Sequence, residues 1–214
     1  NYMDCPDRER GQWWGDAVNE LGETYYALTP DGNKLGMKAL NELFCWQRGD
    51  GVLYSPVPAG NWNKELPSQI LATTGWYGIY MQCYYANDFS VARRHYDRLH
   101  RYLHEVWKTD ANGLAILRQG DWFWGDWGEN IDQLLLQNAW YYLALKGELE
   151  LARLFGKSDD VQTIPLALAT LQGQRTMEAT TLASASLLSI IPTIIFFIIF
   201  QRKLSQGITA GAVK

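Results

Sequence analysis

The thirteen residues from Asp4 to Asp16, DCPDRERGQWWGD, combine side chains suited to acid–base chemistry on a ring-shaped ligand. Acidic residues alternate with Arg8 and Arg10, and the pair Trp13–Trp14 follows at once. Carboxylic acids transfer protons in catalysis, and indole rings offer large flat faces for contact. The mixture predicts a pocket for a polar, ring-shaped ligand, and a sugar is the first candidate.

A plainer interpretation of this stretch is a charged turn followed by an aromatic core anchor. In that case the arginines pair with neighbouring acids on the surface, where ion pairs contribute little to stability. A second cluster, GDWFWGDWGENID from Gly120 to Asp132, repeats the combination of acids, glycine and tryptophan. All ten tryptophans lie between residues 13 and 140. Both observations favour the pocket.

The composition bounds the class of protein. A chain of 214 residues has room for one domain, or one domain plus an appendage. Its net charge of -4 argues against a nucleic-acid-binding surface, which is normally basic. Cys5, Cys45 and Cys83 are widely spaced and predict free thiols, not a disulfide framework or a zinc site. The chain opens at Asn1 without a basic-then-apolar leader, so we expect no signal peptide and interpret the opening as that of a fragment.

Apolar residues recur at helical spacing through most of the first 160 positions. They predict helices at about 17–28, 35–46, 67–85, 90–106 and 131–154, with Ser90 as a helix cap. The short apolar piece Leu114–Leu117 predicts a β strand before the second tryptophan cluster. Helical hairpins joined by tryptophan- and acid-bearing loops predict an all-α array. The pattern does not separate a toroid of hairpins from an open bundle.

Three histidines, His95, His100 and His104, lie on one predicted helix. His100 and His104 have the i, i+4 spacing of a metal-binding pair, but no third ligand stands near them in the sequence. We therefore interpret them as part of a solvated or half-buried face and predict no metal site.

The composition changes after about residue 160. From Thr163 onward there is no tryptophan or tyrosine, and the run Ala179–Phe200 carries no charge. As a helix it would be about 33 Å long, enough to cross a bilayer core. It predicts a transmembrane helix at about 179–200, and Arg202 and Lys203 behind it favour a cytoplasmic C-terminus and a membrane-associated protein. The alternative is a buried helix of a soluble domain.

The opening motif resembles the signature of bacterial α-L-rhamnosidases, glycoside hydrolase family 78 of the six-hairpin glycosidase superfamily. DCPDRER followed by WWGD carries the resemblance. It continues through Glu65–Tyr85, Gly120–Asp132 and Leu134–Lys157, and so covers about residues 1–160.

The resemblance implies a partial (α/α) six-hairpin toroid over residues 1–160 that hydrolyses terminal α-L-rhamnosides with inversion and without a cofactor. By position Glu9 matches the general acid, and Asp4 and Asp16 match acids that hold the rhamnose hydroxyls. An inverting enzyme also needs a second carboxylate, about 6.5–9.5 Å away, to activate water. Neighbouring acids would raise the pKa of Glu9 and neighbouring arginines would lower it, and the sequence leaves that balance open.

Further contacts to the sugar are expected from both tryptophan clusters, although core packing at helix ends explains any single ring equally well. The expected stacking rings are Trp13, Trp14, Trp124 and Trp127, and the expected additional polar contacts are Asp126 and Glu129. The resemblance places the family's general base beyond residue 160, which leaves Glu129 as the best internal substitute. A half-toroid also exposes apolar faces that further hairpins would cover, so we expect low stability and no turnover.

The tail carries a second resemblance. Ile164–Gln174 and Phe200–Lys214 are similar to the C-terminus of maltose-type sugar ABC-transporter permeases. This implies a permease-like segment at 161–214, with 179–200 as its last membrane span. The leading hypothesis is a rhamnosidase fragment with a carbohydrate substrate and a membrane helix, and without nucleic acid as a partner. The alternatives are a membrane-anchored carbohydrate-binding remnant and a permease fragment.

Overall fold

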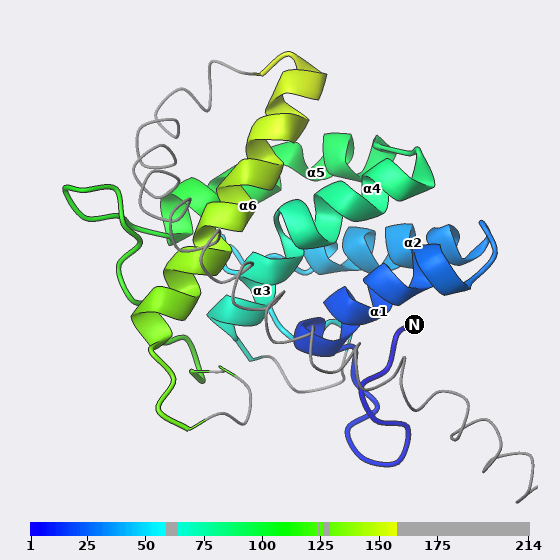
Figure 1. Ribbon diagram of the computed structural model, residues 1–214, viewed down its shortest axis with the longest axis horizontal. Helices are drawn as coiled ribbons and strands as arrows, with labels where there is room; N and C mark the ends of the chain where they lie inside the picture. The colour runs from blue at the N-terminus through cyan, green and yellow to red at the C-terminus, as the bar shows by residue number, and fades with distance from the viewer. Residues whose placement is uncertain (59–63, 124, 126–128, 158–214) are drawn as a thin grey trace, which may run out of the picture. The chain divides into compact units, whose positions relative to one another are not determined.

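The computed structural model describes residues 1–58, 64–123, 125 and 129–157, all within one compact unit, Asn1–Ile164. This part of the chain is built from helices and connecting loops (Figure 1). The all-α prediction is therefore confirmed for the described residues.

The first two predicted helices form a helical hairpin. α1 (Trp14–Ala27) and α2 (Gly32–Cys45) are joined by a short turn and pack on each other (Figure 1). Apolar positions three and four residues apart put one face of each helix in the core, as Leu21 in α1 and Leu40 in α2 show by their burial.

The third predicted helix is broken into three pieces. α3 (Pro67–Thr73) is followed by a π-helical turn, η1 (Trp76–Tyr80), and by α4 (Met81–Ala86). The break falls at Gly75, whose φ of -126° and ψ of -148° are not helical. A Cβ atom there would lie 2.2 Å from the Cα of Ala144, so the break lets another helix approach closely.

The remaining helices are α5 (Ser90–Arg101), a second π-helical turn, η2 (Tyr102–Val106), and the long α6 (Gln133–Phe155). The Ser90 side chain does not cap α5; instead the Asp88 carboxylate accepts the Ser90 N–H at 2.8 Å. α6 begins at a side-chain cap, because the Asp132 carboxylate accepts the backbone N–H of Leu135 at 3.0 Å. It ends at Gly156, whose φ is 71°.

The strand predicted at Leu114–Leu117 is wrong. The described residues here contain only an isolated antiparallel bridge between Thr109 and Ala115. The Asn138 side chain on α6 donates to the Ala115 carbonyl and accepts the Ala115 N–H at 2.8 Å. Those backbone groups are thereby satisfied without a neighbouring strand.

The core lies between the helices. α1 packs on α3, α2 packs on α5, and α6 packs on both α3 and η1. The largest fully buried side chains of this core are Trp14, Trp107, Tyr96, Tyr102, Phe44, Leu21, Leu40, Leu43, Leu53, Leu66, Ile70 and Leu71.

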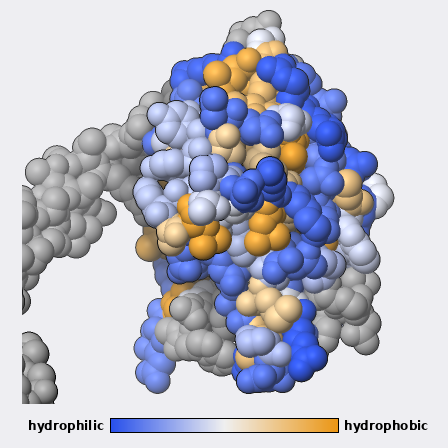
Figure 2. All heavy atoms as spheres, turned by 90° about the vertical axis from the view of Figure 1, so that its right-hand side faces the viewer, coloured by the Kyte–Doolittle hydropathy of each residue, from blue (hydrophilic) through white to orange (hydrophobic). Residues whose placement is uncertain are grey.

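Several large apolar side chains remain exposed, among them Leu28, Leu135 and Leu154. On the face shown in Figure 2, hydrophobic residues are interspersed with hydrophilic ones. Scattered apolar exposure of this kind is ordinary for a protein surface and does not by itself mark an interface.

Among the described residues, no helix is both long and apolar enough to cross a bilayer. The membrane helix predicted at 179–200 lies outside the residues that the structure describes.

Candidate active site

The N-terminal loop is anchored at both ends to the helical body. The backbone of Gln12 exchanges hydrogen bonds with the segment after α2, because its N–H donates to Pro58 at 3.2 Å and its carbonyl accepts from Val57 at 3.2 Å. At the other end the Tyr2 hydroxyl is hydrogen-bonded to the Thr24 hydroxyl of α1 at 2.9 Å.

Between these anchors the loop closes on itself. The Asp4 N–H donates to the Gly11 carbonyl at 3.0 Å, and the Gly11 N–H donates to the Asp4 carboxylate at 3.0 Å. The Arg10 N–H donates to the Cys5 carbonyl at 3.1 Å, with Arg10 itself in the left-handed region at φ 54°. The closed loop carries Glu9 at the edge of a cavity formed with α1 and α3.

This cavity has a volume of about 290 Å³, near the lower end of the range for ligand pockets. It brings together four of the residues predicted from the sequence: Glu9, Asp4, Asp16 and Trp13. The other lining residues are Cys5, Arg8, Leu66, Gln69 and Trp122. Three carboxylates and two indole rings thus line one cavity.

A second cavity of about 330 Å³ adjoins the first and shares two lining residues with it, Asp16 and Gln69. The rings of Tyr77 and Trp140 also line it.

The sequence did not single out Leu66, Gln69 and Trp122. Leu66 and Gln69 lie at the start of α3, within the stretch that carried the rhamnosidase resemblance, and Trp122 lies within the second tryptophan cluster. The Ser55 hydroxyl holds Gln69 by donating to the side-chain oxygen of Gln69. The same hydroxyl accepts the backbone N–H of Trp14 at 3.1 Å. No local pattern reveals such a contact between distant segments.

The electrostatic balance around Glu9 favours its carboxylate. A hydrogen bond from its own backbone N–H lowers its pKa most, partial burial raises it, and the hydrogen bond with Asp4 and the Arg8 guanidinium, 3.0 Å away, lower it further. The side chain is 27% exposed, so solvent screens these effects. In the free protein the candidate acid is therefore ionised at neutral pH.

One predicted stacking ring is corrected by the structure. Trp14 is 0% exposed and packs in the core as the first residue of α1, so its faces are not available to a sugar. Adjacent residues at a helix start point in different directions, and here Trp13 alone reaches the cavity.

The predicted contacts from the second tryptophan cluster are placed only in part. Glu129 is exposed and does not line either cavity described above. Trp124, Asp126 and Trp127 lie outside the described residues.

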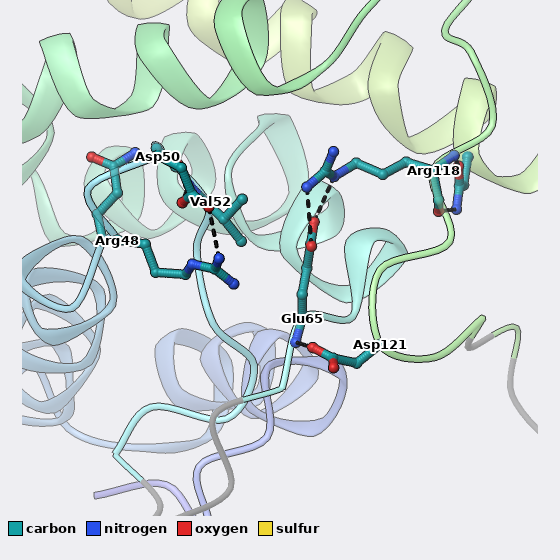
Figure 3. A network of polar contacts seen from close by, with 9 residues as sticks. Arg48, Asp50, Val52, Glu65, Arg118 and Asp121 are labelled. Atoms are coloured by element: carbon teal, nitrogen blue, oxygen red, sulfur yellow. Dashed lines mark hydrogen bonds and ion pairs between the residues drawn. The ribbon is translucent and has the colours of Figure 1, made fainter.

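A buried ion pair holds the cavity wall in place. Arg118 donates to both carboxylate oxygens of Glu65, from Nε at 2.6 Å and from Nη2 at 3.0 Å (Figure 3). The Glu65 N–H donates to Asp121 at 2.7 Å, and the Asp121 N–H donates to the Glu65 carbonyl at 2.9 Å. These contacts join the segment that leads to Trp122 to the start of α3, which carries Leu66 and Gln69.

Replacement of the acid in this pair should lower stability. Glu65 is buried and Arg118 is partly buried, so Glu65→Gln leaves the guanidinium without its counter-charge. We expect the free energy of unfolding to fall by about 2 kcal/mol in urea denaturation. The matched control is Glu150→Gln, which breaks an exposed pair with Arg153 and should cost less than about 1 kcal/mol. Equal effects of the two substitutions would contradict this role for the buried pair.

Comparison with known proteins gives the family. The family model for the bacterial alpha-L-rhamnosidase 6 hairpin glycosidase domain matches residues 1–166, which confirms the resemblance predicted from the sequence. A partial relative is the arabinooligosaccharides transport system permease protein AraQ of Halalkalibacterium halodurans, 40% identical over 58 residues. That match covers 27% of this chain and 21% of the permease, so the chain spans about a fifth of that relative's length. No solved structure matches. The chain therefore belongs to the bacterial α-L-rhamnosidase six-hairpin glycosidase domain family.

Proposed function

We propose that this domain binds the terminal α-L-rhamnosyl group of a glycoside in the cavity beside the N-terminal loop, and that Glu9 is the general acid of its inverting hydrolysis. The observation that carries the proposal is the convergence of Glu9, Asp4 and Asp16 with the indole of Trp13 in one cavity. A glycosidase domain implies a carbohydrate substrate, and the family gives rhamnose as the sugar.

Five of the cavity residues have a task in this proposal. Asp16, in the first turn of α1, and Asp4 accept hydrogen bonds from the sugar hydroxyls. Trp13 and Trp122 cover the apolar faces of the ring. Glu9 lies at the loop edge, where it donates a proton to the glycosidic oxygen as the bond breaks.

The second carboxylate of the mechanism limits what this chain does by itself. Among the described residues that line the cavity, the acids are Asp4, Glu9 and Asp16. If Asp4 and Asp16 bind hydroxyls and Glu9 donates the proton, none of the three is left to activate water. The proposal therefore includes a specific second candidate: the 214-residue chain binds the sugar and hydrolyses rhamnosides slowly or not at all.

Removal of one hydroxyl-binding charge should weaken the binding of methyl α-L-rhamnoside. Asp16→Asn replaces a charged hydrogen-bond acceptor by a neutral one, and we expect the dissociation constant to rise about tenfold in isothermal titration calorimetry. The matched control is Asp31→Asn, which removes the same charge from the exposed turn between α1 and α2 and should leave binding unchanged. Wild-type affinity in Asp16→Asn would remove Asp16 from the site.

The role of Glu9 is separated from binding by a chromogenic aryl α-L-rhamnoside. Any release of chromophore by the wild-type chain should be lost in Glu9→Gln, while both proteins bind rhamnose. With an aryl group that leaves poorly unless it is protonated, equal release by the two proteins would reject Glu9 as the acid. Binding by both without release identifies the chain as a carbohydrate-binding piece of the enzyme.

A further inference from the structure

Three potential metal ligands meet at a place that the sugar cavity does not include. His100 lies in the last turn of α5, His104 lies in the π-helical turn η2 that continues it, and Glu148 lies on α6. α6 packs beside α5 and η2 (Figure 1). Nδ1 of His100 is 2.8 Å from one Glu148 oxygen, and Nε2 of His104 is 2.7 Å from the other. The ligand atoms of the three side chains all lie within 4.8 Å of one another.

The burial of the three groups is graded from the surface inward. The Glu148 side chain is 0% exposed, whereas the side chains of His100 and His104 are 33% and 25% exposed. The carboxylate therefore forms the base of the cluster, and the imidazoles form its mouth toward solvent.

The charge of the cluster is negative when both imidazoles are neutral. Each oxygen of the Glu148 carboxylate is hydrogen-bonded to one ring nitrogen, Oε1 to Nδ1 of His100 and Oε2 to Nε2 of His104. A carboxylate only accepts hydrogen bonds, so each facing ring nitrogen carries the proton. A buried anion is costly unless a positive charge compensates it. Neutral imidazoles supply dipoles and no charge, so the compensating charge comes from a protonated imidazole or from a bound cation.

We propose that His100, His104 and Glu148 form a binding site for a divalent transition-metal ion, with Zn²⁺ as the best fit. Two imidazoles and one carboxylate are a donor set that zinc uses, with solvent in the fourth position. Oxygen-preferring Mg²⁺ and Ca²⁺ suit two nitrogen ligands poorly. Each neutral ring keeps its single proton by carrying it on the other nitrogen once the facing nitrogen binds the ion.

Binding of an ion requires the three side chains to move. Ligand atoms about 2.0–2.1 Å from a tetrahedral ion are about 3.3 Å apart. The two nitrogen–oxygen distances of 2.8 and 2.7 Å must therefore open by about half an ångström, and ligand atoms separated by up to 4.8 Å must come closer, which requires rotation of the part-exposed imidazoles.

The proposed site is separate from the sugar cavities. None of its residues lines them. The cavity residues on α6 are Leu136 and Trp140, and the nearer of the two, Trp140, precedes Glu148 by eight positions or about 12 Å of helix. The bound ion would tie the end of α5 and η2 to α6. Its effect is therefore on stability, and it does not depend on the function proposed above.

Cobalt is the probe that tests the site, because four-coordinate Co²⁺ absorbs visible light. The experiment uses the full 214-residue chain without an affinity tag. Cys45→Ser serves as the background, because the exposed Cys45 thiol would bind the same ions. We expect one equivalent of Co²⁺ to give the visible bands of four-coordinate cobalt and Zn²⁺ to remove them. Zn²⁺ should also raise the melting temperature.

Matched histidine variants locate the ion. His104→Gln keeps a hydrogen-bond donor near Glu148 but removes a ligand, and we expect the affinity for Zn²⁺ to fall about a hundredfold or more, since loss of an outer partner alone costs up to that much. His95→Gln changes a histidine of α5 that is hydrogen-bonded to Asn41 and lies outside the cluster, so this variant should keep wild-type affinity. Circular dichroism checks that both variants fold.

Two results would overturn the proposal. One is the absence of cobalt bands and of a zinc-dependent melting shift in the wild-type ligand set. The other is equal zinc affinity in His104→Gln and His95→Gln. If His104→Gln does not fold, histidine NMR of the unsubstituted cluster decides: Zn²⁺ must shift the ring resonances of His100 and His104 but not those of His95. In any of the negative cases the three residues form a hydrogen-bonded cluster alone.

Discussion

Methyl α-L-rhamnoside should bind more weakly as the pH rises above the lowered pKa of free Glu9, and Glu9→Gln should remove that dependence. In the free protein the pKa of Glu9 is lowered, by its own backbone N–H first, and then by Asp4 and Arg8 against the opposing effect of burial. A general acid must carry its proton when it contacts the glycosidic oxygen. Binding of the glycoside is therefore linked to uptake of one proton.

The direction of the pH dependence follows from the pKa of Glu9 in the free protein and its pKa in the complex. The pKa in the complex lies above that of the free protein, so the linked affinity is fully present below the free pKa. It is lost as the pH rises, at up to about tenfold per pH unit between the two pKa values, and is gone above the complex pKa.

Calorimetric titrations at several pH values and constant ionic strength measure this dependence. Glu129→Gln is the matched control, because Glu129 is exposed and outside the cavities described above, so its variant should keep the wild-type slope. A flat profile for the wild-type protein, or an unchanged slope in Glu9→Gln, would contradict the role of Glu9 as proton donor.

Gly147→Ala should be among the most destabilising single-methyl additions to this fold. Gly147 lies in α6 where the helix meets the break before η1, and a Cβ atom there would lie 2.3 Å from the backbone nitrogen of Trp76. The obstructing atoms are backbone, so no side-chain rotation relieves the overlap, and α6 must shift. We expect the free energy of unfolding to fall by about 3 kcal/mol, the upper end of the usual cost of overpacking.

Gly22→Ala is the control for this substitution. Gly22 is also inside a helix, α1, but the nearest atom to its added Cβ is the Tyr25 hydroxyl at 3.6 Å, an ordinary contact. Here the higher helix propensity of alanine should raise stability by up to about 1 kcal/mol. Urea denaturation followed by far-UV circular dichroism compares the two variants, and similar losses in both would refute close packing at Gly147.

The helices were predictable because their apolar spacing is local information. The stripe of α6 predicted a helix at 131–154, and the structure has it at Gln133–Phe155. The break at Gly75 was not predictable, because it depends on contact with Ala144, far along the chain. The strand prediction failed for a similar reason: the side chain of Asn138 supplies the hydrogen bonds that a second strand would have given.

The candidate active site shows the same division. Glu9, Asp4, Asp16 and Trp13 belong to one continuous segment, so their meeting in one cavity followed from the motif. The opposite wall comes from α3 and Trp122, and its place is set by the Glu65–Arg118 pair across a long separation in sequence. Likewise, the third potential ligand beside the pair His100 and His104 is Glu148 on α6, and only the fold brings it there.

The most direct test of the central claim is to observe where rhamnose binds. In ¹⁵N-labelled protein the indole N–H signals of Trp13 and Trp122, assigned by single Trp→Phe variants, report on the cavity. Titration with methyl α-L-rhamnoside should shift these two signals along one saturable curve and leave that of the buried Trp107 unchanged. Saturable binding that leaves Trp13 and Trp122 unaffected, or no saturable binding at all, would contradict the assignment of this cavity as the rhamnose site.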